Sequence, residues 1–237
     1  MVTISLCMIV KDEEEVLSRC LDSVKDLVDE INIVDTGSVD RTKEIAANYT
    51  DRIFDFKWTN SFAEARNESF SHATKDYILY LDADDIILEE DREKFKILKK
   101  ILNNAVDSVS MYYDASTDEF GNVSLRYRRN RLIKRDKNFQ WEGDCHQYLN
   151  VYGSVINTDI SITHKKIRHA FGRAISIYEN RIKRGDIFSA RDYFYYGNEL
   201  RETGRYEEAI ENYNKNIFME EGWIENKVFS CIFQADC

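Results

Sequence analysis

Three aspartates follow directly after a short apolar segment of the sequence. Residues 77–81 read Tyr-Ile-Leu-Tyr-Leu, and Asp82, Asp84 and Asp85 come next, with Ala83 after the first of them. Two carboxylates separated by one residue can reach the same ligand if the chain bends there, and their hard oxygens suit Mg²⁺ or Mn²⁺. The spacing therefore predicts a divalent cation that bridges a diphosphate. A solvated acidic turn is the alternative.

The apolar segment is typical of a central strand in a parallel sheet, buried on both faces. Ligands of such sheets bind beyond the carboxyl ends of the strands. Asp35 occupies the same kind of position, because it follows the apolar segment 31–34 and precedes Thr-Gly-Ser at 36–38. We expect Asp35 to contact a base or a ribose, whereas Asp40 is expected to cap a helix.

The elements that must position these aspartates alternate between strand and helix. Strands are expected at residues 2–10, 31–34, 52–56 and 76–81, and helices after Asp12, from Asp40 to Tyr49 and from Ser61 to Ala73. In the first helix, apolar residues fall on one face, with Asp12 as the expected cap. Consecutive βαβ units predict a parallel sheet covered by helices on both faces, whose first half binds a nucleotide.

The rest of the chain has a different pattern. After a helix at 89–103, strands are expected at 108–114, 123–134 and 154–163, with a hairpin turn at 118–122. The chain turns helical from Ile167. A tetratricopeptide helix pair is indicated by the spacing of Gly197, Leu200, Gly204, Tyr206, Ala209 and Tyr213. An ordinary helical hairpin is the alternative. Since the sequence stops at Cys237, inside what would be a second repeat, we expect a truncated chain.

Composition narrows the class of protein. The 237 residues, 43% hydrophobic and 32% charged, are typical of a soluble globular protein with one large domain or one plus an appendage. A net charge of −10 disfavours nucleic acid as a partner. Neither a signal peptide nor an apolar run of the roughly 20 residues that span a membrane is expected. For that reason a cytoplasmic protein is predicted. Five cysteines without a Cys-x-x-Cys pair indicate reduced thiols.

Four ordered segments resemble the inverting family-2 glycosyltransferases of the GT-A fold. They are residues 5–13 (Ser-Leu-Cys-Met-Ile-Val-Lys-Asp-Glu), 34–38 (Val-Asp-Thr-Gly-Ser), 62–67 (Phe-Ala-Glu-Ala-Arg-Asn) and 81–85 (Leu-Asp-Ala-Asp-Asp). The resemblance covers residues 1–165 and implies an α/β fold with a Rossmann-like mixed sheet flanked by helices. The small α-helical repeat region at 166–237 makes the chain similar to bacterial members that glycosylate peptides or proteins.

The resemblance also implies which residues bind a uridine-diphosphate sugar donor and its Mn²⁺ or Mg²⁺ ion. The implied contacts are Lys11 and Glu13 beside the base, Asp35 at the uracil or ribose, Arg66 at the uracil or diphosphate, Asp82 and Ala83 near the ribose, and Asp84 at the metal. Asp82, His146 and His164 are further candidate metal ligands, because the family places the two histidine segments near the donor phosphates. The cation would stabilise the charge that develops on the departing diphosphate.

An inverting reaction also needs a base on the opposite face of the sugar. Residues 141–147 (Trp-Glu-Gly-Asp-Cys-His-Gln) resemble the family's Trp-x-Gly-x-x-His-Glu motif, but Gln147 stands where the acid is usual. Glutamine does not accept a proton usefully, so the base is predicted to be Asp144, with Glu142 and Asp85 as alternatives. Otherwise the acid is dispensable or the enzyme is impaired.

One cationic cluster lies in the expected strand 123–134 and just after it. Its members are Arg126, Arg128, Arg129, Arg131, Lys134 and Arg135. The cluster could bind an acceptor or a pyrophosphate, but a solvated strand edge is the preferred interpretation. Alternation along the strand predicts Arg126 and Arg128 on the same face.

Together these features predict a metal-dependent inverting glycosyltransferase that moves a sugar from a uridine-diphosphate donor to a peptide or protein side chain. The helical repeats would present the acceptor and could form an oligomer. The alternatives are transfer to a glycan or a lipid-linked sugar, and an impaired nucleotide-binding adaptor that acts through its repeats. A nucleotidyltransferase is disfavoured, because residues 11–15 (Lys-Asp-Glu-Glu-Glu) are acidic where it would need a glycine-rich basic loop.

Overall fold

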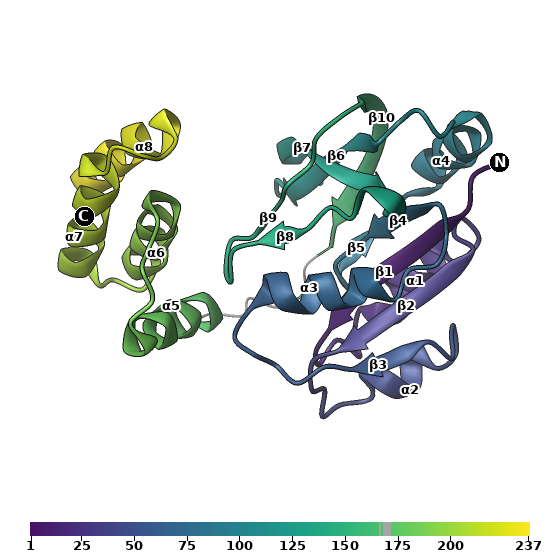
Figure 1. The fold of residues 1–237 in the computed structure, drawn as a ribbon, viewed down its shortest axis with the longest axis horizontal. Helices are drawn as coiled ribbons and strands as arrows, with labels where there is room; N and C mark the ends of the chain where they lie inside the picture. The colour runs from purple at the N-terminus through teal and green to yellow at the C-terminus, as the bar shows by residue number, and fades with distance from the viewer. Residues whose placement is uncertain (166, 168–171) are drawn as a thin grey trace. The chain divides into compact units, whose positions relative to one another are not determined.

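The computed structural model describes residues 1–165, 167 and 172–237. By their contacts, the residues form two compact units (Figure 1). Met1–Gly143 and Gln147–Arg168 form the first, which we call the sheet unit, and Asp144–His146 and His169–Cys237 form the second, which we call the helical unit. Among the described residues, no helix has both the length and the apolar character needed to cross a membrane.

The sheet unit is built on a mixed sheet, which has eight strands within the described ranges, in the order β3-β2-β1-β4-β7-β6-β10-β5 (Figure 1). The strands are β1 (Ile4–Val10), β2 (Glu30–Asp35), β3 (Ile53–Asp55), β4 (Tyr77–Tyr80), β5 (Asp85–Ile86), β6 (Ser108–Thr117), β7 (Val123–Lys134) and β10 (Val155–His164). The first four strands of this order are parallel, whereas β7 is antiparallel to both β4 and β6. The carboxyl ends of β1, β2 and β4 therefore meet at one edge of the sheet.

Helices cover both faces of this sheet. Those of the sheet unit are α1 (Leu17–Val24), α2 (Thr42–Ala46), α3 (Phe62–Ser71) and α4 (Glu89–Ile101), with a 3-10 turn at Arg135–Lys137. The residues of α1, α2 and α4 share one apolar core with Leu6 and Met8 of β1, while α3 shares another with Cys7. Because successive side chains of a strand point to opposite faces, β1 contributes to both cores and is buried between them.

The predicted alternation of strand and helix is confirmed, and so is the hairpin turn at 118–122, where Asp118 N donates to the carbonyl of Asn122 at 2.8 Å. The predicted cap of the first helix is wrong. The helix begins at Leu17, with Val16 at the cap position. Asp12 instead has a left-handed backbone (φ 53°), and its carboxylate accepts a hydrogen bond from Val39 N at 2.8 Å. Asp12 thus ties the loop after β1 to the loop after β2.

The second helix is shorter than predicted and spans only Thr42–Ala46. Asp40 lies just before it and accepts hydrogen bonds from Thr42 N at 2.9 Å and from Glu14 N at 3.1 Å. Asp40 therefore satisfies a backbone donor of the helix, as a cap would, and also fixes the loop after β1.

The side chains of β7 alternate as predicted, with Arg126 and Arg128 both over the ring of Tyr112. The interpretation of the cationic cluster as a solvated edge is wrong for Arg131, whose side chain is fully buried. The segment Arg131-Leu132-Ile133 lies where β7 pairs with its neighbours in the centre of the sheet, which is why it is covered.

Two further strands, β8 (Trp141–Glu142) and β9 (Tyr148–Leu149), form a small hairpin. The helical unit contains α5 (Arg173–Arg184), α6 (Ala190–Glu202), α7 (Tyr206–Phe218) and α8 (Ile224–Ala235). The helix pair predicted from its small and aromatic residues is confirmed as α6 and α7. Gly197 is needed there, since a Cβ atom at this position would lie 2.7 Å from the ring of Tyr213.

Candidate active site

The acidic turn after β4 is fixed by one of its own carboxylates. Asp85 is fully buried, and its Oδ2 accepts a hydrogen bond from Asp82 N at 3.0 Å, while Asp85 N donates to the Asp82 carbonyl at 3.0 Å. The other carboxylate oxygen, Oδ1, accepts a hydrogen bond from the hydroxyl of Tyr113 at 3.0 Å. Asp85 therefore determines the shape of the turn that carries Asp82 and Asp84.

Arg131 supplies the charge that a buried carboxylate needs. Its Nη2 lies 3.1 Å from Asp85 Oδ2, and neither side chain is exposed to solvent. The guanidinium lies 4.9 Å from the ring centre of Tyr80 and 4.6 Å from that of Tyr113, and Nη1 donates to the Tyr80 carbonyl at 3.2 Å. Sequence reasoning missed this role. The apolar residues Leu132 and Ile133, next in sequence, were the signal that the strand enters the core.

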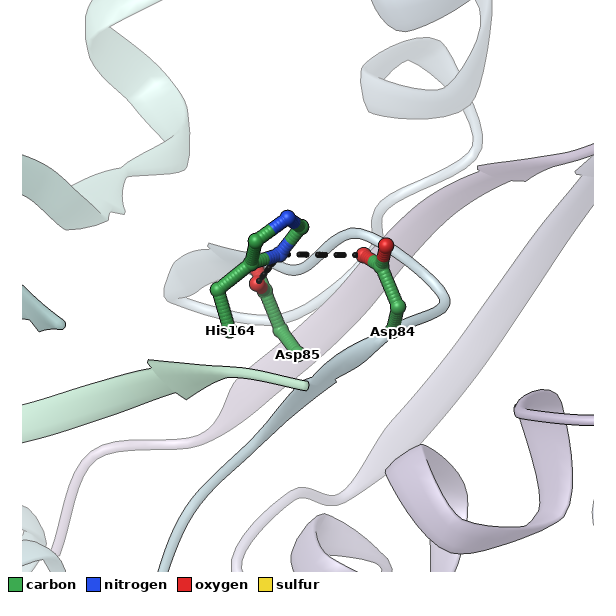
Figure 2. Close-up of side chains that lie close together, drawn as sticks. All are labelled: Asp84, Asp85 and His164. Atoms are coloured by element: carbon green, nitrogen blue, oxygen red, sulfur yellow. Dashed lines mark hydrogen bonds and ion pairs between the residues drawn. The ribbon is translucent and has the colours of Figure 1, made fainter. Parts of the chain in front are cut away.

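His164 faces the turn from the end of β10 (Figure 2). Antiparallel pairing of β10 with β5 puts His164 opposite Asp85. Its Nδ1 lies 3.3 Å from an oxygen of Asp84 and 3.3 Å from an oxygen of Asp85. Hydrogen bonds to Asp84 and then to Asp85 raise the pKa of His164 to about 9. One ligand atom from each of the three lies within 4.8 Å of the others, so the group could hold a metal ion.

Asp82 pairs with Arg66 rather than with His164. Its Oδ1 accepts a hydrogen bond from Arg66 Nη2 at 2.6 Å, and the Arg66 guanidinium lies 4.9 Å from the ring centre of Trp141. Although burial alone would raise it, the pKa of Asp82 is held well below its usual range by the guanidinium groups of Arg66 and Arg131. Arg66 is thus linked to the acidic turn, with its Nε buried and without a hydrogen-bond partner in the described structure.

Asp35 ends β2 beside the end of β1, where the register pairs it with Val10. Its Oδ1 accepts hydrogen bonds from Gly37 N and Ser38 N, both at 2.9 Å. The other oxygen, Oδ2, is buried and has no hydrogen-bond partner among the residues described. Because a buried acceptor without a partner is costly, this oxygen is suited to a donor group on a ligand.

The remaining predicted residues lie in the loops after β1 and β4 and in the β8–β9 hairpin. Lys11 is exposed, the backbone N of Glu13 donates to Thr42 Oγ1 at 2.7 Å, and Ala83 is buried in the acidic turn. Within the hairpin, Gln147 belongs to the sheet unit, whereas Asp144 and His146 belong to the helical unit. The roles of Asp144, Gln147 and His146 in catalysis and metal binding stay predictions.

The family described as "Glycosyl transferase family 2" matches residues 5–160, which is more than half of the sequence. The chain belongs to this family, and the predicted membership is confirmed.

Two relatives extend the comparison. The SPbeta prophage-derived glycosyltransferase SunS of Bacillus subtilis (strain 168) is 27% identical over 225 residues, which cover 91% of this chain and 53% of SunS. A TPR repeat-containing protein of Synechococcus elongatus is 50% identical over 90 residues, 38% of this chain and 22% of that protein. The chain thus spans about half of one relative and less of the other.

Solved structures of low sequence identity have the same fold. Glucosyl-3-phosphoglycerate synthase from Mycobacterium tuberculosis, in complex with Mn²⁺ and UDP-glucose, matches with a TM-score of 0.52 at 14% identity, covering 80% of this chain and 81% of that one. S. aureus TarS 1–349 in complex with UDP-GlcNAc matches with a TM-score of 0.54 at 12% identity, covering 91% and 80%. The predicted α/β fold of GT-A type is confirmed.

Proposed function

We propose that the chain is a metal-dependent inverting glycosyltransferase that moves a sugar from a uridine-diphosphate donor to a peptide or protein side chain. The observation that carries the proposal is the group of Asp84, Asp85 and His164 at the carboxyl edge of a sheet in a family-2 glycosyltransferase. Similar structures contain Mn²⁺ or Mg²⁺ with uridine diphosphate or its sugars, which supports this donor class.

Asp84 and His164 are the proposed metal ligands, and Asp85 is proposed to hold them. Both oxygens of Asp85 are engaged by Arg131, Tyr113 and the backbone of the turn, whereas the side chain of Asp84 is 23% exposed. A set of one carboxylate and one imidazole suits Mn²⁺ better than Mg²⁺, because Mg²⁺ prefers oxygen ligands. A bound cation would supply positive charge to the departing diphosphate.

Asp35 is proposed to bind the nucleoside. Its unpartnered Oδ2 can accept a hydrogen bond from a ribose hydroxyl or from the uracil N–H, while Oδ1 is held by the following loop. Asp82 and Ala83 would lie near the ribose, and Arg66, which is paired with Asp82, would lie by the uracil or the diphosphate. Lys11 and Glu13 would form the wall beside the base.

The acceptor and the catalytic base complete the proposal. A peptide or protein acceptor is favoured, because stacked helical repeats offer an extended binding surface. We keep Asp144 as the proposed base, since Gln147 cannot accept the proton and Glu142 accepts hydrogen bonds from Tyr148 and Asn150.

Calorimetric titration of uridine diphosphate with Mn²⁺, and then with a chelator, tests the donor site without knowledge of sugar or acceptor. We expect binding only with the metal. Asp84→Asn should abolish the metal-dependent binding of uridine diphosphate and leave the fold intact, and the control Asp159→Asn, at an 80% exposed side chain, should leave this binding unchanged. If the wild-type chain bound uridine diphosphate equally well with and without Mn²⁺, the metal assignment would be contradicted. Binding with metal but no transfer to any acceptor would favour the adaptor, for which Gln147 is the argument.

A further inference from the structure

One arginine of β7 carries a charge that no aspartate of the acidic turn neutralises. Arg66 and Arg131 are each paired with an aspartate of that turn. Arg129 lies two residues before Arg131, and its side chain is partly buried. Among the residues that the structure describes, no carboxylate forms an ion pair with Arg129. A partly buried cation of this kind, within the sheet unit, is suited to an anionic ligand.

The pairing of β7 with β4 brings Arg129 to the donor edge of the sheet. The two strands are antiparallel, and their register pairs Leu132 with Leu79. Because the strands run in opposite directions, the residues that precede Leu132 lie beside those that follow Leu79. The residues that follow Leu79 lead into the acidic turn at 82–85. Arg129 is therefore at the level of that turn.

The ring of Tyr113 connects Arg129 with the proposed metal site. The Arg129 guanidinium lies 4.7 Å from the centre of this ring. The Tyr113 hydroxyl donates to Asp85 Oδ1 at 3.0 Å, and the ring centres of Tyr113 and His164 are 5.7 Å apart. One aromatic side chain thus contacts both the unpaired guanidinium and two members of the group that could hold a metal ion.

The Arg129 side chain is also held in place. Its Nη2 donates to the hydroxyl of Tyr127 at 3.1 Å, and the guanidinium lies 5.3 Å from the centre of that ring. Contact with two aromatic rings favours a guanidinium and restricts its movement. Since the hydrogen bond to Tyr127 uses one of several N–H donors, the others can bind a ligand.

We propose that Arg129 binds the β-phosphate of the uridine-diphosphate donor and stabilises the charge that this group gains during transfer. The bond from the acceptor atom to the anomeric carbon forms, and the bond from that carbon to the β-phosphate oxygen breaks. The electron pair stays on this oxygen, and the acceptor proton passes to the base. The planar guanidinium fork can donate to two phosphate oxygens at the place where the negative charge develops.

The charges of the site favour the donor over an anionic acceptor as the ligand of Arg129. The two ion pairs of the turn are neutral, so Asp84 is the carboxylate that remains beside the diphosphate and its cation. Arg129 offsets this negative charge. The inference rests on the proposed function, because the diphosphate lies beside Asp84 and His164 only if these residues bind the donor's cation.

Calorimetric titration of Arg129→Gln in the presence of Mn²⁺ tests the proposal, with uridine diphosphate and uridine monophosphate as probes. We expect about 10-fold weaker binding of uridine diphosphate, because a hydrogen bond to a charged group is lost. Uridine monophosphate has no β-phosphate, so its affinity should not change. This second probe also shows that the nucleoside site of the variant is folded. Arg129→Lys keeps the charge without the fork, and its affinity for uridine diphosphate should lie between those of wild type and Arg129→Gln.

The matched control is Arg128→Gln, at the preceding residue of the strand. The Arg128 guanidinium lies 3.9 Å from the ring centre of Tyr112 and donates to the Thr158 carbonyl at 2.9 Å. The control therefore removes the same charge and a similar ring contact from the other side of the strand, and it should change neither affinity.

Four results would overturn the proposal. They are an unchanged affinity of Arg129→Gln for uridine diphosphate, equal losses for the two nucleotides, an equal loss in Arg128→Gln, and an Arg129→Lys variant that binds as weakly as Arg129→Gln. Failure of the proposed function is distinguishable, because the wild-type chain would then bind no uridine diphosphate with or without Mn²⁺, and the inference would be rejected with it.

Discussion

At the scale of residues, three aspartates of one turn have three different environments. Asp82 is paired with Arg66, Asp84 is partly exposed beside His164, and Asp85 is buried against Arg131. The side chains are chemically identical, so their different contacts must separate their roles. The buried pair fixes the turn, and the partly exposed carboxylate is left for a ligand.

The buried ion pair gives the first stability prediction. Arg131→Met would leave Asp85 buried without its charge partner, which typically costs about 3–5 kcal/mol. The free energy of unfolding in urea measures this loss. The control Arg41→Met breaks the pair with Glu44, whose two side chains are 74% and 72% exposed, and should cost about 1 kcal/mol or less. Equal losses in the two variants would show that burial of the Arg131 pair is energetically unimportant.

His164 predicts how stability depends on pH in the metal-free chain. Its pKa is raised from 6.5 to about 9, so the native state binds this proton more tightly than the unfolded state does. The resulting stabilisation is complete below pH 6.5 and is lost as the pH rises through about 9. Thermal unfolding in a chelator should therefore show a loss between these values that His164→Gln lacks. The same pH dependence in the variant would assign the effect to another group.

At the scale of elements, the sequence pattern predicts the strands that end in aspartate. It does not predict that His164, at the end of β10, lies opposite Asp85. Asp35 and Asp82 follow apolar segments whose pattern is readable along the chain. β5 has only two residues, which are too few for a periodic signal, and it pairs with a strand far along the sequence. The position of His164 opposite Asp85 therefore follows from tertiary pairing. The family resemblance suggested only that the segment of His164 lies near the donor phosphates.

Arg131 was misread for a related reason. The sequence shows a run of cations from Arg126 to Arg135, and such a run usually lies in solvent. In the structure, the first half of β7 is exposed and the segment from Arg131 enters the core. The two apolar residues that follow Arg131, Leu132 and Ile133, are the local signal of burial, and the cations around them obscure it. By contrast, Gly197 and Tyr213 were predicted from spacing alone, since their contact joins neighbouring helices.

The contact between α6 and α7 gives a prediction for the helical unit. Gly197→Ala would put a methyl group 2.7 Å from the ring of Tyr213, so the two helices would have to separate. Overpacking of this kind typically costs about 1–3 kcal/mol. Circular dichroism during thermal unfolding measures the change. A lower midpoint would not come from helix propensity, because alanine favours a helix more than glycine does. An unchanged midpoint for Gly197→Ala would mean that the pair packs more loosely than described.

At the scale of the whole molecule, the chain has a net charge of −10, and the proposed donor is itself anionic. Within the sheet unit, Arg66 and Arg131 are already paired with Asp82 and Asp85. Little positive charge is then left in the turn for a diphosphate, which is a physical reason to expect a cation in this site. It is then a question whether a bound donor stabilises the sheet unit alone or both compact units.

Hydrogen exchange of the whole chain can answer that question. Uridine diphosphate and Mn²⁺ at about 100 times their dissociation constant should stabilise the binding-competent state by about 2.7 kcal/mol. We expect slower exchange at residues 35–38 and 82–85, and no change in α7 and α8. Protection confined to the helical unit would contradict a donor site at the edge of the sheet.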